Sequence, residues 1–545
     1  MFAIAYRVRV LGVGFFFAGL MLVLTRLQAK FSNFPPSKPE EFTAASRSVK
    51  PGLVCCGIVS AGTWSATLLQ SSTAAYTFGV SGPWWYGVGG TIQMAFFAMV
   101  AAKVKMNANG AHTFLEIVKI RFGTGAHLLF TFYAFLCILV TCGSLLLGGA
   151  ATVTALTGMN TIAACFLLPI GIAVYVVFGG LRATFICDWA HTIILFIIIY
   201  LFAGRTYGTS PEIGGIRGMY DLLKQAAIDT PVQGNEGGSY LTMRSNQGIT
   251  FGAAIMISGY WQRMFGGISW FAIPWAFASC LGLAARALIN NPKFPTYPYP
   301  LSASQTSAGL AAPAAATVVM GKGGAVAILL AVLKTYQIAE FIPRGVITVA
   351  NLAEPYSAVC SGLTALLFSG VITILVSLWN PANYDFEGTR AIIVYDKSDG
   401  VAGVLPTSYD PEEKGSNAEQ GKGEGKDAKG DGIVLLQDTG EQEKRDPPDS
   451  ATTPVDIESL QRVFVKASWY SIFLACCVAI FVPLPMFFSR YVFSEGFYTF
   501  WVACSIIWVA LSGIFCIILP LWESRKEITV IARGVVGMMP RKAAP

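Results

Sequence analysis

Long apolar runs separated by polar stretches constrain this chain more than any other feature of its sequence. Several of these runs hold enough apolar residues to cross a bilayer as a helix, among them Ala358–Trp379, Ser468–Phe488 and Thr499–Leu521. Charged residues form only 13% of the chain, against about 25% in a soluble protein. The sequence therefore predicts an all-α polytopic membrane protein with roughly eleven to twelve spans, a number typical of channels and secondary transporters.

Several functional classes find no support in the sequence. Nine of the twelve cysteines lie inside apolar runs and behave there as small hydrophobic side chains, and three histidines are too few for a histidine-rich metal site. Gly321-Lys322 is followed by Gly323, so the phosphate-binding loop of a nucleotide-driven pump is absent. A net charge of +7 gives no reason to invoke nucleic acid. We expect no cofactor apart from a coupling ion, and no obligatory protein partner.

Basic residues predict the orientation of the chain. The loop Gln28–Lys50 carries four lysines and arginines, against Arg7 and Arg9 ahead of the first apolar run. Basic loops face the cytoplasm, so we expect the N-terminus outside. Lys103 and Lys105, which follow two spans later, agree with this orientation.

The chain divides into four regions by composition. A low-complexity, charged stretch marks a hydrophilic insert that we expect to be cytoplasmic and largely disordered. The predicted regions are a transmembrane core at 1–379, with a first helix at about 8–27 and a broken helix at about 52–82, the insert at 380–466, two helices at 467–522, and a basic cytoplasmic tail at 523–545.

The stretch Val59–Gln93 is the first candidate for a functional site. It begins as an apolar run, turns polar at Gln70–Thr73, and then meets Gly79, Gly82 and Pro83, which weaken helix continuity. In lipid, a broken helix is tolerated only where its freed backbone groups face protein or water, and those groups can ligate a cation and a small polar solute. The alternative is a loop between two ordinary spans, with the Ser/Thr run packing helix against helix.

Asp188 and His191 lie near the start of a later apolar span. A carboxylate there is costly and indicates a functional site. The alternative is a structural latch in which Arg182, six residues earlier, pairs with Asp188. A single histidine on an apolar helix is usually only packed, and no nucleophile or metal-ligand cluster accompanies His191, so the sequence gives no basis for an enzyme.

The string Tyr260–Arg263 ends a short apolar segment. Its aromatic and amide groups suit a flat, neutral, amide-like solute. The alternative is an aromatic belt at the membrane interface, ended by a cytoplasmic arginine.

Several long strings resemble the urea-transporting members of the sodium:solute symporter family. They include SAGTWSATLLQSSTAAYTFGVSGPWWYGVGGTIQ, YVVFGGLRATFICDWAHTIILF and FPTYPYPLSASQTSAGLAAPAAA. The resemblance implies a LeuT-type fold with two inverted five-helix repeats and extra peripheral helices. It also implies import of urea across the plasma membrane by alternating access, coupled to a proton or sodium, and it leaves polyamines open as further substrates.

The resemblance also implies site residues by position. Cation ligands would come from the backbone around Leu69 and Ser72, with Asp188 as the acidic residue near the cation route. The substrate contacts it implies are Gln70, Ser71, Trp85, Tyr86, Gln93, Tyr260 and Trp261.

One departure from the family pattern concerns the second repeat. Ala327–Val332 should lead into a helix rich in Ser and Thr that completes the cation site, but the chain continues as Leu333–Tyr336. We therefore expect an internally shortened chain with an incomplete second repeat. Three interpretations stay open: an active transporter with compensating helices, an inactive copy, or a gene model that skipped coding segments. A non-transporting urea sensor that signals through residues 380–466 is a fourth.

Overall fold

The computed structural model describes most of the helical part of the chain. It covers residues 39–45, 48–63, 65–108, 110–258, 269–333, 386–390 and 457–538, with scattered positions in 12–30 and 371–378. Within these residues the protein is almost entirely helical, and two isolated bridges are the extended pairings that it holds. The predicted all-α class is confirmed.

The first candidate stretch folds as three helices, α3 (Pro51–Gly62), α4 (Ser65–Phe78) and α5 (Ser81–Asn107). α3 and α4 are bent by 60° at their junction and together pass as one broken span. Gly79 ends α4 at a φ of +73°, and Pro83 stands in the first turn of α5, where its missing N–H is tolerated. The bent pair of α3 and α4 lies within the stretch, about 52–82, where the sequence predicts a broken helix.

The predicted position of the break, at Gln70–Thr73, is wrong, because α4 continues through these residues and the bend falls at 63–65. The polar side chains are satisfied without breaking the helix. The Ser71 and Ser72 hydroxyls both donate to the Leu68 carbonyl, at 3.3 and 2.7 Å, and the Thr73 hydroxyl donates to the Thr306 carbonyl at 3.1 Å.

The next two helices, α6 (Phe114–Thr157) and α7 (Thr161–Gly204), are each interrupted at a glycine. Gly123 has a φ of +81° and Gly180 a φ of +61°, values that a side chain would make costly. The first interruption separates the short arm of α6 before Gly123 from the long apolar arm after it. The second divides α7 just before Arg182, so that Arg182 and Asp188 lie on the arm that follows it.

The polar segment 206–246 is more regular than its composition suggests. It contains the π-helix η2 (Arg205–Thr209) and the amphipathic helix α8 (Gly215–Asp229), which buries Met219 and Leu223. The other described elements are α2 (Pro39–Ala44), η3 (Glu236–Gly238), α9 (Asn246–Ser258), η4 (Ile273–Ala278), α11 (Ser279–Ala287), α12 (Ala303–Ser307), α13 (Ala311–Leu333), α16 (Glu387–Arg390), α17 (Ile457–Cys476), η6 (Cys477–Phe481), α18 (Pro483–Phe488), α19 (Glu495–Gly513), η7 (Ile514–Ile518), α20 (Leu519–Glu523) and α21 (Arg525–Met538).

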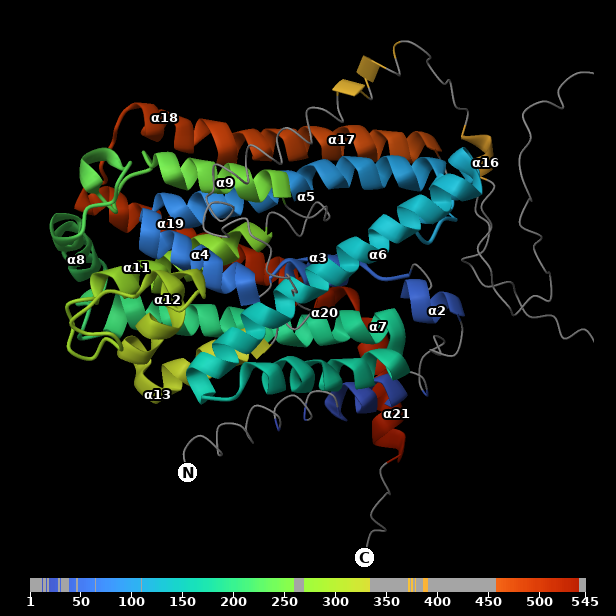
Figure 1. Ribbon diagram of the computed structural model, residues 1–545. Helices are drawn as coiled ribbons and strands as arrows, with labels where there is room; N and C mark the ends of the chain where they lie inside the picture. Colours follow the sequence, from blue (N-terminus) through green and yellow to red (C-terminus); the bar gives the residue numbers. More distant parts are fainter. Residues whose placement is uncertain are drawn as a thin grey trace, which may run out of the picture.

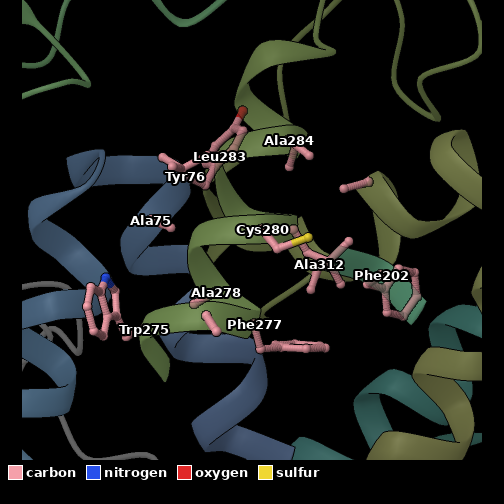
Figure 2. Packing of buried hydrophobic residues seen from close by; sticks show 14 of the residues in the cluster. Ala75, Tyr76, Phe202, Trp275, Phe277, Ala278, Cys280, Leu283, Ala284 and Ala312 are labelled. Atoms are coloured by element: carbon pink, nitrogen blue, oxygen red, sulfur yellow. The ribbon is translucent and has the colours of Figure 1, made fainter. Parts of the chain in front are cut away.

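The long helices lie side by side, with α5 against both α9 and α17 (Figure 1). α4, which follows the bend after α3, packs against η4, α11 and α13 through small residues such as Ala75, Ala284 and Ala312 (Figure 2). A Cβ at Gly282 would collide with the Ser72 carbonyl oxygen, so this glycine lets α11 approach the backbone of α4.

The described residues include five helices long and apolar enough to cross a membrane, or six if the bent pair counts as one span. Most of the predicted span Ala358–Trp379 and part of the predicted first helix lie outside the described residues, as does the stretch directly after Leu333, where the second repeat is expected to be shortened.

Candidate functional site

The bend between α3 and α4 frees backbone carbonyls at the end of α3, as every helix end does. The Thr63 hydroxyl donates to the Val59 carbonyl at 2.5 Å. The Gly62 carbonyl accepts from the Thr67 hydroxyl at 3.1 Å and from the Trp270 indole N–H at 2.7 Å. Main chain from α3, a hydroxyl from α4 and an indole from the span Ser269–Ala287 thus meet at one point.

Aromatic rings line this point. The Tyr86 ring of α5 lies 6.2 Å from the Trp270 ring and 5.9 Å from the Phe251 ring, centroid to centroid. Gly90 makes room for Trp270, because a Cβ at this position would collide with the indole. The result is a buried junction with one carbonyl, one hydroxyl and ring faces, a set that suits a small, flat, neutral solute.

Asp188 stands beside the last turn of α3. Its Oδ1 accepts a hydrogen bond from the Ser60 hydroxyl at 2.8 Å, and its carbonyl accepts a weak one from Cys56 Sγ at 3.8 Å. A Cβ at Gly57 would lie 3.9 Å from Oδ2. The carboxylate is therefore held on α7 within one turn of the carbonyls at the bend, a position in which it can bind a cation or a proton.

Arg182 forms its ion pair with Glu41 of α2. The Arg182 guanidinium donates to both Glu41 carboxylate oxygens, to the Ala45 carbonyl at 2.8 Å and to the Ser48 hydroxyl at 2.6 Å. Both charged residues are buried, and α2 also covers the Gly180 interruption of α7 through Phe42. The sequence analysis offers a latch between Arg182 and Asp188 as one alternative. In the structure Arg182 pairs with Glu41 instead. His191 contacts Cys187 Sγ at 3.6 Å within α7, as a packed histidine would.

The residues of α4 that the sequence predicts as site residues lie beyond the bend, further along the chain. The Gln70 amide donates to the Ser307 carbonyl at 2.9 Å, and Leu69 packs beneath Gly309. Ser71 and Ser72 are fully buried. The backbone carbonyls of Leu69 and Ser72 lie inside a continuous helix, so the structure does not bring them to the carbonyls at the bend.

The remaining predicted residues divide into two groups. Trp85 is buried against Gly252 of α9, and its indole N–H has no hydrogen-bond partner among the described residues. Gln93 belongs to α5, but its side chain lies outside the described residues, as do Tyr260 and Trp261 entirely. Tyr86 and Asp188 are therefore the predicted residues whose described contacts lie at the bend.

Sequence reasoning missed Gly62, Thr67, Ser60 and Trp270. Trp270 lies in an apolar run, where nothing in the sequence distinguishes a tryptophan at a site from one in the core. The other three residues lie at the bend, and the sequence analysis places the bend several residues too late in the chain. A signal was available in Gly89-Gly90 of α5, since adjacent glycines in an apolar helix indicate close approach of another group.

Comparison with known proteins identifies the family of this chain. Residues 42–371 match the sodium:solute symporter family. The chain belongs to this family. It is therefore an ion-coupled transporter of the membrane and not an enzyme.

Two curated relatives align over nearly the whole chain. The urea active transporter of Saccharomyces cerevisiae is 32% identical over 96% of this chain and 91% of its own length. The urea-proton symporter DUR3 of Oryza sativa is 32% identical over 98% of this chain and 86% of its own. These alignments run over 681 and 636 positions, more than the 545 residues of this chain, so both relatives carry segments that have no counterpart here.

Among solved structures, a sodium-coupled sialic acid symporter in a substrate-bound, outward-open state aligns over 69% of this chain and 82% of its own. The sequence identity is 12% and the TM-score 0.42, and the likeness adds nothing to the family assignment.

Proposed function

We propose that this protein imports urea across the plasma membrane by alternating access, driven by the proton gradient. The observation that carries the proposal is the 32% identity to urea transporters over nearly the whole chain. The name of the rice relative supports the proton over sodium as the coupling ion. Polyamines are a further substrate class to be tested in the same way.

The junction at the bend supports urea as the solute. Urea is flat and neutral, with N–H donors on both sides and one carbonyl acceptor. When the hydrogen bond between the Gly62 carbonyl and the Thr67 hydroxyl opens, the carbonyl can accept from urea and the hydroxyl can donate to it, and the rings of Tyr86 and Trp270 offer faces for stacking. The other residues proposed for substrate contact are Gln70, Ser71, Trp85, Gln93, Tyr260 and Trp261.

The coupling site that we propose centres on Asp188. A carboxylate in an apolar span is costly unless it binds a proton or a cation, and this one lies one turn from the carbonyls that the bend frees. The backbone of Leu69 and Ser72 remains a second proposal for cation ligation. Because α3 and α4 meet at 60°, α3 can tilt against α4 without breaking either helix, which is the motion that alternating access requires.

The proposed orientation places the N-terminus outside, and the insert 380–466 and the tail inside. Lys50, Lys103 and Lys105 at the cytoplasmic ends of α3 and α5 support it, since basic residues favour the inner side of a membrane.

Uptake of radiolabelled urea in yeast cells that lack urea transport tests the proposal. We expect saturable uptake that a protonophore abolishes and that replacement of sodium leaves unchanged. Uptake that follows sodium instead would overturn proton coupling. Normal surface expression without uptake would identify an inactive copy, or a sensor if urea still binds to the purified protein.

A further inference from the structure

The C-terminal helix α21 (Arg525–Met538) starts where the last apolar span, Glu495–Glu523, ends. Its start therefore lies at the boundary of the bilayer. Trp522 is 65% exposed there, and the Arg525 guanidinium lies 4.5 Å from the centre of its ring. Exposed tryptophan beside a basic residue is typical of the membrane interface. In Figure 1, α21 runs across the direction of the long helices rather than along it.

The helix has two chemically distinct faces. Apolar residues recur at helical spacing along one of them, at Ile528, Ile531, Ala532 and Val535. Ile528 is 45% exposed and Ala532 is exposed too, while Ile531 is half-buried, so the described part of the protein leaves Ile528 and Ala532 uncovered on this face.

The opposite face is basic. Lys526 and Arg533 share it, Arg525 lies at the border with the apolar face, and all three are exposed. Glu527 is the acidic residue of the helix, and Lys50 pairs with it at 3.0 Å. The charge that α21 presents outward is therefore positive, and its complement is an anionic surface.

The first turn of α21 is joined to the start of the broken helix. The Glu523 carboxylate accepts from the Gly52 amide at 2.8 Å and so binds one of the amides that have no partner within α3. The Lys50 ammonium donates to the Glu523 carbonyl at 2.8 Å. Residues at the end of the last span thus hold the N-terminus of α3.

We propose that α21 lies in the interface of a membrane leaflet rich in anionic phospholipid, with its apolar face among the acyl chains and its basic face among the headgroups, and that this docking steadies the N-terminus of α3 through Glu523 and Lys50. A basic amphipathic helix that continues a membrane span can reach no other extended surface as directly. Bound α21 fixes the position of Glu523, and Glu523 fixes Gly52. The charge of the lipid then affects how firmly the N-terminus of α3 is held, and α3 is the helix that we propose tilts during transport.

Hydrogen–deuterium exchange of the full-length protein in lipid nanodiscs tests the proposal. We expect the amides of 525–538 to exchange about tenfold more slowly in discs with about one-third phosphatidylserine than in pure phosphatidylcholine. High salt should remove the difference, because it screens charge at the surface. The double variant K526E/R533E should remove it as well.

Arg217 and Lys224 of α8 offer the matched control. Arg217 pairs with Glu495, at the opposite end of the span that leads into α21. The double variant R217E/K224E changes the charge equally and should leave the lipid effect on α21 intact. Equal exchange of α21 in both lipids would overturn the proposal, as would protection that rises with the number of protein copies per disc whatever the lipid, since that indicates a second copy as the occupant.

The connection to α3 has its own readout. Phosphatidylserine should slow exchange at Gly52 and Leu53, and Glu523→Gln should remove that effect while α21 remains protected. An unchanged response of Gly52 in Glu523→Gln would overturn the connection. None of these measurements involves urea, so they stand or fall independently of the proposed transport.

Discussion

α4 and the arm of α6 that follows Gly123 are both apolar helices, yet their surroundings are opposite. Leu68 and Ala75 of α4 are at most 1% exposed, and Gly282 admits the backbone of α11 to contact distance. Leu128 and Tyr133 of α6 are 64% and 60% exposed. Lipid provides no hydrophobic force between helices, so close protein packing needs small residues and polar contacts. The comparison teaches that the Ser and Ala of α4, with Gly282 of α11, mark close packing between helices, whereas the bulky side chains of α6 mark contact with lipid.

The largest expected effect lies at Gly282. In Gly282→Val the new side chain meets the Ser72 carbonyl and Ala75, and we expect destabilisation of about 1–3 kcal/mol or more, as for other overpacked cores. Gly125→Val on α6 is the control, since a Cβ there meets nothing within 4 Å. Thermal unfolding followed by size-exclusion fluorescence measures both. Equal losses in the two variants would remove the contrast between α4 and α6.

Asp188 should give the largest effect on transport. Asp188→Asn keeps the size of the side chain and removes its charge, and we expect urea uptake to fall by at least about tenfold at normal surface expression, because intramembrane carboxylates carry ion coupling. Thr131→Ala on α6, which removes an exposed hydroxyl bonded to its own helix, should leave uptake unchanged. Full uptake in Asp188→Asn that still responds to a protonophore would exclude the carboxylate from coupling.

Trp270→Phe isolates one hydrogen bond at the bend. The variant keeps a ring and loses the donor to the Gly62 carbonyl, which should change the KM for urea by the equivalent of about 0.5–1.5 kcal/mol. Trp84→Phe loses a comparable bond to the Val478 carbonyl, away from the bend. Its stability should fall while its KM for urea stays the same. If the two variants change KM equally, the bend has no special role in binding.

The smallest effect concerns Glu212, outside both helices. Hydrogen bonds from Lys293 and Asn291 hold the pKa of the Glu212 carboxyl below its usual value. The stabilisation it brings is therefore present above that usual value and is lost as pH falls through the lowered pKa. Thermal unfolding between about pH 3 and 6 should show a slight acid-side loss that Glu212→Gln lacks. A pH dependence that Glu212→Gln retains in full would assign the loss to other carboxyls.

The sequence predicts that the first candidate stretch is interrupted, but not the residues at which the interruption falls. Gly180 interrupts α7 at a positive φ, a conformation that glycine adopts without a steric cost. The α3–α4 bend is displaced, since hydroxyls that donate within their own helix look the same in sequence as hydroxyls that replace a broken one. Trp270 and the Glu41–Arg182 pair depend on contacts between distant segments, which a single sequence does not encode visibly.

The Gly62 carbonyl has a consequence for the speed of the transport cycle. It already accepts two hydrogen bonds, from Thr67 and from Trp270, so both of its lone pairs are occupied before a solute arrives. A solute at this oxygen must exchange one bond for another, and the net gain is small. At the urea site that we propose, we therefore expect urea to bind loosely and to leave quickly, which favours flux at high supply over scavenging at low supply.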